Sequence, residues 1–307
     1  MFNSVRSKII LLLLLFSFVP LLVSRAIIYP EVWKAFQEAR IRDLESVGYK
    51  QANIITSWME ERTYDAKSFA NEFLTSSFTK FSPSDEQFAK LTTHLRLLRD
   101  TYGYKEISII DNSAEIKVST RDDLLGVNVG EFDYFQEASK GKTFVSNIRP
   151  SVFPIHNEYG EMERGVPTIL VSSPVRDMTN RIIGVICLRV DVVALSREMR
   201  RVKMGKSGET YLVDKNGFMI SESRFVPTIR NMGLIKKRTS LELKLIDPKT
   251  GQLTKGVQAC LKGESGYDAE GYRDYRGILV LGFWHWLPEY QWALMSEIDV
   301  EEAYKAL

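Results

Sequence analysis

Three short stretches of this chain occur twice, in the same order and at nearly the same spacing. Residues 109–116 (IIDNSAEI) are echoed by 212–219 (LVDKNGFM), residues 169–173 (ILVSS) by 278–282 (ILVLG), and residues 184–192 (GVICLRVDV) by 291–300 (QWALMSEIDV). Branched and aromatic residues suit these stretches to strands, and Asp, Asn and Gly suit their interruptions to turns. Ordered self-similarity indicates tandem copies of one structural unit. We therefore predict two strand-rich modules.

Length and composition are compatible with this division. The chain has 307 residues, enough for two domains that each bury their own core. Its formal net charge is +2, so nothing in the charge balance points to a nucleic-acid partner. Cys187 and Cys260 are too few for a disulfide framework, and we expect them to be unpaired.

The N-terminus carries an apolar run at residues 9–28 that includes five consecutive leucines. This run reaches the length that a bilayer-spanning helix needs. Arg6 and Lys8 precede it, which predicts a cytoplasmic segment at residues 1–8 and export of the rest. A cleaved signal peptide is the alternative. No small-x-small cleavage site stands out and helical sequence follows at once, so we favour an uncleaved transmembrane signal anchor.

Residues 31–103 are predicted to be helical. A long helix at 30–81 carries an apolar stripe at helical spacing, consisting of Leu44, Val47, Gln51, Ile54, Ile55, Trp58, Met59, Phe69, Phe73 and Leu74. We expect this stripe to be core, laid on both modules. Ser82-Pro83-Ser84-Asp85 ends the long helix and caps a second one at 86–101, whose apolar side is formed by Phe88, Leu91, Leu95 and Leu98.

The two modules follow, giving an α+β fold. In the first, residues 104–192, strands are predicted at 105–120 as a pair, 143–148, 168–175 and 182–191. In the second, residues 193–300, a connecting helix at 192–202 precedes strands at 210–214, 218–221, 267–274, 278–285 and 292–299. A polar stretch at 224–256 separates the second and third of these strands. Residues 301–307 begin a further helix.

An export anchor, a long membrane-standing helix and two tandem modules together resemble the double Cache (dCache) sensor domain. That domain is the extracytoplasmic part of many bacterial chemoreceptors, sensor histidine kinases and cyclic-di-GMP enzymes. The resemblance covers about residues 31–304 and is carried by four segments: 184–199, GETYLVDKNG with SESRF at 208–225, Asp274-Tyr275-Arg276-Gly277, and residues 286–299.

The resemblance implies that each module is a PAS-like antiparallel sheet and that the ligand pocket lies in the membrane-distal module, residues 104–192. The amino-acid-binding branch of the family has an Arg-x-Trp-Tyr motif before a short helix and an Asp after the last strand's glycine-valine run. Here Tyr134 and Phe135 match the aromatic pair, Phe132 stands where the Arg would be, and Arg189 stands near the position of the acid. The family's charges for gripping an α-amino acid are thus missing, which argues against an amino-acid ligand.

Our candidate ligand-binding residues are Ser119, Arg121, Tyr134, Phe135, Ser172 and Arg189. Ser172 interrupts an apolar strand, and a buried hydroxyl needs a hydrogen-bond partner. Arg121 and Arg189 together suit a carboxylate, because guanidinium forks match that group. For each polar residue the alternative is bonding to solvent or backbone, and Arg189 has the further alternative of pairing with a surface Glu.

Enzymatic chemistry has little support in the sequence. His94, His156 and His285 lack metal-ligand spacing, and neither a phosphate-binding glycine loop nor a Gly-x-Ser-x-Gly elbow occurs. We expect no catalytic residue, metal or cofactor, and interpret Asp214 and Asp274 as turn and strand-end residues.

These observations predict an extracytoplasmic small-molecule sensor of a bacterial signalling receptor, single-pass in the inner membrane. We expect a homodimer, with no nucleic-acid partner. The alternative is a dimerising or interaction ectodomain without a small ligand. In the resembled proteins a second membrane helix and a signalling domain usually follow this point, so the sequence predicts either a truncated chain or a sensor that signals through a separate partner.

Overall fold

The structure is a computed structural model that describes residues 5–75 and 85–305. The helices are α1 (Val5–Val23), α2 (Tyr29–Thr75), α3 (Asp85–Tyr102), α4 (Asp133–Ser139), α5 (Val192–Met199), α6 (Val226–Asn231), α7 (Lys255–Cys260) and α8 (Val300–Ala303), with a π-helical turn η1 (Ser24–Ile28) and a 3-10 turn η2 (Asp122–Leu124). The strands are β1 (Glu106–Asp111), β2 (Ile116–Ser119), β3 (Phe144–Val145), β4 (Arg149–Pro150), β5 (Ile155–His156), β6 (Met162–Glu163), β7 (Pro167–Arg176), β8 (Ile182–Asp191), β9 (Glu209–Val213), β10 (Gly266–Arg273), β11 (Leu279–Leu287) and β12 (Trp292–Asp299).

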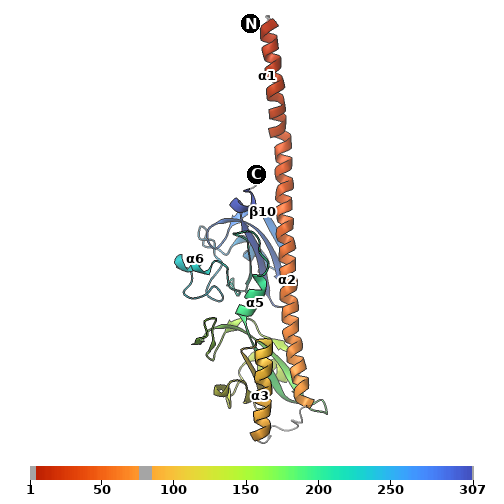
Figure 1. Cartoon of the computed structure of the whole chain (residues 1–307), viewed down its shortest axis with the longest axis vertical. Coiled ribbons are helices and arrows are strands. Elements are labelled where there is room, and N and C mark those ends of the chain that lie inside the picture. Colours follow the sequence, from red (N-terminus) through yellow and green to blue (C-terminus); the bar gives the residue numbers. More distant parts are fainter. Residues whose placement is uncertain (1–4, 76–84, 306–307) are drawn as a thin grey trace.

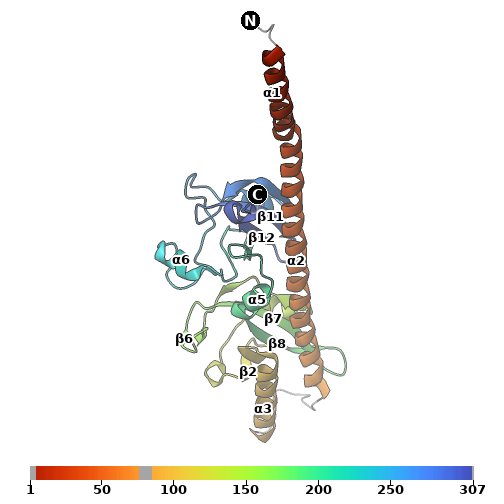
Figure 2. The same cartoon turned by 45° about the horizontal axis from the view of Figure 1, so that its top comes forward.

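The molecule is built along one helical rod. Helices α1 and α2 are joined through η1 into one continuous helix, and the two sheets lie one after the other along α2 (Figure 1). The sheet containing β10–β12 lies nearer α1. The sheet containing β7 and β8 lies at the far end, beside α3 (Figure 2).

The N-terminal part of this rod is apolar and uncovered. Among the described residues, one helical segment, Leu12–Glu72, contains a window long and apolar enough to cross a membrane, with a mean hydropathy of 2.1 and none of the window buried by the rest of the protein. Exposed leucines and phenylalanines of this kind are stable in lipid rather than in water. The helix is therefore compatible with a membrane anchor.

The two sheets repeat one topology. The first has the strand order β2-β1-β8-β7-β3, with β4 also paired to β7, and the second has the order β10-β11-β12-β9. In the first sheet β8 pairs with β1, the first strand of its module, on one side and with β7 on the other. In the second sheet β12 pairs in the same way with β9 and with β11. All four pairs are antiparallel. This repetition of order confirms the two sheet modules that the echoed stretches predict.

The echoes also share their turn chemistry. In four hairpins an aspartate Oδ1 accepts the amide N–H groups of the second and fourth residues beyond it, and the third residue has a positive φ; the pairs are Asp111 with Ala114, Asp177 with Asn180, Asp214 with Gly217, and Asp274 with Gly277. Asp suits this position because its short side chain bonds to its own turn. The interpretation of Asp214 and Asp274 as turn residues is confirmed.

The apolar stripe of α2 faces both sheets, as predicted. Six of its members, Leu44, Gln51, Ile55, Trp58, Met59 and Phe69, are buried. The side chains of Phe73 and Leu74, and the predicted helix break at 82–84, lie outside the described residues. One core cluster combines α2 with one face of the first sheet, including Ile107 and Ile109, and extends to Trp292 in the second. The long helix is therefore packed on both modules.

One prediction for the second module, the strand at 218–221, is wrong. Residues 218–221 form only isolated bridges, Val213 with Met219 and Phe218 with Lys244, because their backbone groups bond to the segment at 241–245 as well as to β9. The polar stretch at 224–256 contains α6 and the start of α7. The sequence does not predict these two helices because the stretch lacks helical periodicity. Cys187 and Cys260 are both buried and free.

Gly48 sets how closely α2 approaches the second sheet. A Cβ at this position would lie 2.3 Å from Cδ1 of the Phe283 ring, which is itself buried. Glycine normally costs a helix interior about 1 kcal/mol relative to alanine. The close approach of helix and sheet explains why glycine is kept here.

We expect Gly48→Ala to destabilise the chain by about 1–3 kcal/mol, since the overpacked methyl group outweighs the gain in helix propensity. Chemical unfolding of the full chain measures the difference. Ser46→Ala, at an exposed position of the same turn, is the control and should be neutral or stabilising. A stabilising Gly48→Ala would show that the helix and Phe283 do not pack this tightly.

Candidate functional site

One face of the first sheet carries a row of small polar side chains. In the antiparallel register Ser119 is opposite Ser108, Ser108 is opposite Cys187, and Cys187 is opposite Ser172. Residues directly opposite each other point to the same face, so these four form one row across β2, β1, β8 and β7. The face is the one turned away from α2, because the alternate residues Ile107 and Ile109 pack on the helix side.

The next row along the same face contains a buried ion pair. Glu106 lies opposite Arg189, and the Arg189 Nε donates to Glu106 Oε2 at 2.7 Å. Both residues are almost fully buried, with 3% of Glu106 and 5% of Arg189 exposed. The Ser108 hydroxyl donates to Glu106 Oε1 at 2.8 Å and lies 3.0 Å from the Ser119 hydroxyl. Arg189 thus has a glutamate partner, but in the core rather than on the surface.

Arg121 approaches the same carboxylate from the other side. Its Nη1 lies 4.0 Å from Glu106 Oε2, too far for a hydrogen bond, and this buried nitrogen has no hydrogen-bond partner. The other guanidinium nitrogens bond to Asp123, with Nε at 3.1 Å from its Oδ1. Arg121 is therefore held in place by Asp123 while one buried donor remains unsatisfied.

The aromatic candidates come from the short helix that covers this face. Phe132 stacks on Tyr134 with their ring centroids 5.5 Å apart, and the Ser172 hydroxyl donates to the Tyr134 carbonyl oxygen at 2.7 Å. Burial raises the pKa of the Tyr134 phenol well above its ordinary value, and the charges of Arg189, Glu106 and Arg149 also act on it. Tyr134 therefore lies close to the charged cluster, while Phe135 is in the apolar core of the same face.

The structure brings the six candidate residues onto one face of one sheet. Ser119, Arg121 and Arg189 surround Glu106, and Tyr134, Phe135 and Ser172 lie beside them. Sequence reasoning missed Glu106. Strand alternation could have placed it on the same face as Ser108, because residues 106, 108 and 110 share a face, but its pairing with Arg189 is seen only in the structure. With Asp123 included, two guanidinium groups face two carboxylates, and the Nη1 of Arg121 is the buried donor in this cluster that has no hydrogen-bond partner.

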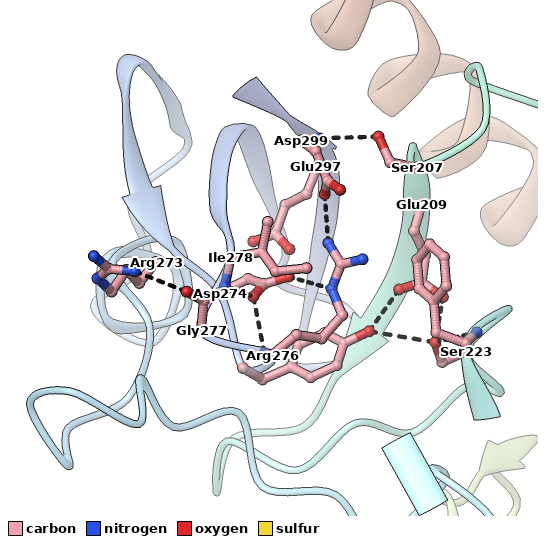
Figure 3. A network of polar contacts seen from close by, with 12 residues as sticks. Ser207, Glu209, Ser223, Arg273, Asp274, Arg276, Gly277, Ile278, Glu297 and Asp299 are labelled. Carbon is pink, nitrogen blue, oxygen red and sulfur yellow. Dashed lines mark hydrogen bonds and ion pairs between the residues drawn. The ribbon is translucent and has the colours of Figure 1, made fainter. Parts of the chain in front are cut away.

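A second polar network lies in the other sheet (Figure 3). Arg276 donates to Asp274 at 2.6 Å and to Asp299 at 2.7 Å. Nearby, Glu209 accepts from the Ser223 hydroxyl at 2.6 Å, and Glu297 accepts from the Tyr211 and Tyr272 hydroxyls at 2.8 and 2.6 Å.

This network holds more carboxylates than cations. Glu209 and Glu297 are buried directly opposite each other on β9 and β12. Burial raises the pKa of Glu209, and burial together with the charge of Asp274 raises that of Glu297 to about 8. Tyrosine and serine hydroxyls of the same module donate hydrogen bonds to both acids.

Comparison with known proteins identifies the family that has this architecture. A model of the Cache domain, in its double form (dCache), matches residues 34–307. Among curated proteins, no sequence match is found. The ligand-binding domain of the Campylobacter jejuni chemoreceptor Tlp3, solved with 4-methylisoleucine, superposes with a TM-score of 0.62 at 12% identity, over 88% of this chain and 94% of that one.

Two further structures have similar folds. The sensor domain of the Vibrio cholerae histidine kinase DctB gives a TM-score of 0.54 at 13% identity, over 85% of this chain and 98% of that one. The ligand-binding domain of Mlp24, solved with asparagine, gives 0.55 at 14% identity, over 88% and 98%. Sequence identities of 12–14% show only that the fold is similar. The family model, by contrast, matches nearly the whole chain that follows the N-terminal apolar segment. The chain therefore belongs to the double Cache (dCache) family.

Proposed function

We propose that the chain is the extracytoplasmic sensor part of a bacterial signalling receptor, and that it binds a small carboxylate at the polar face of the first sheet. The observation that carries this proposal is the unpartnered, buried Nη1 of Arg121 beside the Glu106–Arg189 pair. A buried donor without a partner is costly, and a ligand oxygen placed there would satisfy it.

Two of the similar domains, those of Tlp3 and Mlp24, were solved with amino acids, 4-methylisoleucine and asparagine. An α-amino group would need a free acidic partner in this cluster. Glu106 already receives Arg189 and Ser108, so an ammonium group would compete with a cation for the same carboxylate. At Arg121 the Nε and Nη2 are held by Asp123, but Nη1 is an unused donor that a ligand carboxylate can reach without displacing a partner, which favours acids that lack the amino group.

We expect succinate to stabilise the protein more than aspartate does, and the same order for other pairs of an organic acid and its α-amino analogue. Calorimetry and thermal shift on the full chain measure both members of each pair. A charge-assisted hydrogen bond is worth about 1.5–3 kcal/mol, so Arg121→Gln should weaken binding by roughly one to two decades. Arg181→Gln, in an exposed hairpin of the same module, is the matched control.

Tighter binding of the amino forms would contradict the carboxylate assignment and would indicate that this site binds amino acids. Failure of every metabolite class to stabilise the chain would instead support a dimerising or interaction ectodomain. Double Cache domains are receptor domains, so the binding measurement itself, without an enzymatic assay, tests the role of Arg121.

The proposed topology has the N-terminus in the cytoplasm, residues 9–28 in the inner membrane and the sheets outside, with the first sheet distal to the membrane. Its support is the uncovered apolar helix preceded by Arg6 and Lys8. We expect a reporter that is active only in the cytoplasm to be silent when fused after Leu307, and the same reporter fused before Met1 to be active. Activity at both ends would contradict export.

A further inference from the structure

A long loop of the first module reaches the second module on the side away from α2. It runs from β4 to β7 and contains the β5–β6 hairpin, in which Ile155 pairs with Glu163 and His156 with Met162. Figure 2 shows β6 on the same side as α6, far from the rod. We call residues 149–166 the strap.

The first end of the strap touches the candidate ligand site. Arg149 donates to Asp133 Oδ2 at 2.7 Å, and Asp133 is the residue before Tyr134 at the start of α4. The base of the strap is closed by the buried Ser151, whose backbone accepts from Gly165 and donates to Val166, and whose hydroxyl accepts from the Val166 amide at 3.1 Å. The base of the strap is therefore tied to α4 by an ion pair and closed by three hydrogen bonds of its own.

The other end of the strap is bonded to the second module. Glu163 accepts from Arg238 Nη2 at 3.0 and 2.9 Å and from Lys237 Nζ at 2.9 Å. Arg238 is 5% exposed, so this bridge is shielded from solvent on one side. The next residue, Thr239, bonds to the backbone of Ser223 at 2.8 Å, and the Ser223 hydroxyl bonds to Glu209 in the network of Figure 3.

A like charge acts weakly against this docking. Glu158, in the turn of the hairpin, acts on Glu222 of the second module and adds to the effect of burial in raising the pKa of Glu222. Attraction at Glu163 and repulsion at Glu158 thus act on the same small hairpin. The hairpin is thus attached to the second module through the ion pairs of one side chain, Glu163, and a contact of this kind can form and break as a two-state coupling element requires.

We propose that the strap couples the ligand site of the first module to the second module, by docking Glu163 on Lys237 and Arg238 in one state and releasing it in the other. This inference rests on the proposed function for the identity of the site, but the contacts that carry it are independent of the ligand. By linkage, whatever shifts the docking of Glu163 also shifts α4, and the reverse holds with the same coupling.

Hydrogen exchange on the full chain in detergent tests the coupling without any ligand. Glu163→Gln keeps the shape of the side chain and removes its charge, and should speed exchange about tenfold at residues 232–242 and measurably at α4. Arg149→Gln, at the other end, should speed exchange at residues 232–242. Glu161→Gln is the matched control, because the side chain of Glu161 accepts only a long bond of 3.4 Å from Asn157 within the hairpin, while its backbone bonds to Asn157 are unaffected by the substitution. Unchanged exchange in β11 and β12 shows that each variant is folded.

Exchange that changes only within residues 155–163 would overturn the proposal, as would an equal effect from Glu161→Gln. A second arm adds succinate as the probe and should change exchange at residues 232–242 in the wild type but not in Glu163→Gln. If succinate fails to bind, the carboxylate assignment fails while the ligand-free arm still decides on the strap.

Discussion

Replacing Glu297 by glutamine should remove much of the loss of stability that the chain otherwise shows between pH 5 and pH 8. In the folded protein the pKa of Glu297 is raised to about 8 from an ordinary value of 4.5, chiefly by burial and further by the charge of Asp274. Between these two values the folded chain holds a proton that the unfolded chain has released. The free energy of unfolding therefore falls as the pH rises, by about 1.4 kcal/mol per pH unit for this group.

The direction of this effect follows from the raised pKa. The contribution of Glu297 is fully present below pH 4.5 and is lost as the pH rises through about 8. Glutamine is neutral at every pH and retains one acceptor and one donor group for the hydroxyls of Tyr211 and Tyr272. The variant should match the wild type near pH 5 and be more stable at pH 8.

Chemical unfolding followed by tryptophan fluorescence, repeated across pH 5 to 9, measures both curves. Glu270→Gln is the control, since it removes an exposed carboxylate of the same sheet. Parallel curves for Glu297→Gln and the wild type would show that Glu297 is ionised in the folded state. At the acid end other groups dominate: hydrogen bonds lower the pKa of both Glu163 and Glu302 to about 2, so their contributions are present above pH 4.5 and are lost as the pH falls.

The sequence predicts the sheets well because repetition and alternation are local signals. The predicted strands at 168–175 and 182–191 correspond to β7 and β8, and the echo of the last strand corresponds to β12. Helices α6 and α7 were not predicted because each is six residues long, and so short a helix shows little apolar periodicity. Tertiary packing, rather than local pattern, holds elements of this length.

The sequence could group the candidate residues but could not show how they pair with one another. Tyr134 and Arg189 could be placed by resemblance, and they do lie on one face. Whether Arg189 is free to hold a ligand depends on Glu106, which is 83 residues away in the sequence and meets it only through the register of β1 and β8. Register is set by the three-dimensional pairing of strands, so a single sequence does not show which acid neutralises which arginine.

This pairing leads to a large expected effect of Arg189→Ala on the folded protein itself. Removal of the guanidinium leaves the carboxylate of Glu106 buried, with 3% of the residue exposed, and its distance of 4.0 Å from Arg121 is too great for a replacement hydrogen bond. Breaking a buried ion pair from one side typically costs about 3–5 kcal/mol. We expect Arg189→Ala to fall in this range, and Glu106→Gln to be destabilising as well.

The double variant Glu106→Gln/Arg189→Met should recover most of the loss, because no buried charge is then left without its partner. A double-mutant cycle made of Glu106→Gln, Arg189→Met and the double variant, measured by chemical unfolding, isolates this coupling. Lys90→Ala is the control, since Lys90 and Glu86 form an exposed ion pair on α3 whose removal should change the free energy of unfolding by less than about 1 kcal/mol. Additive effects of the two single variants would show that Glu106 and Arg189 do not depend on each other. In that case Arg189, like Arg121, would be available to a ligand carboxylate.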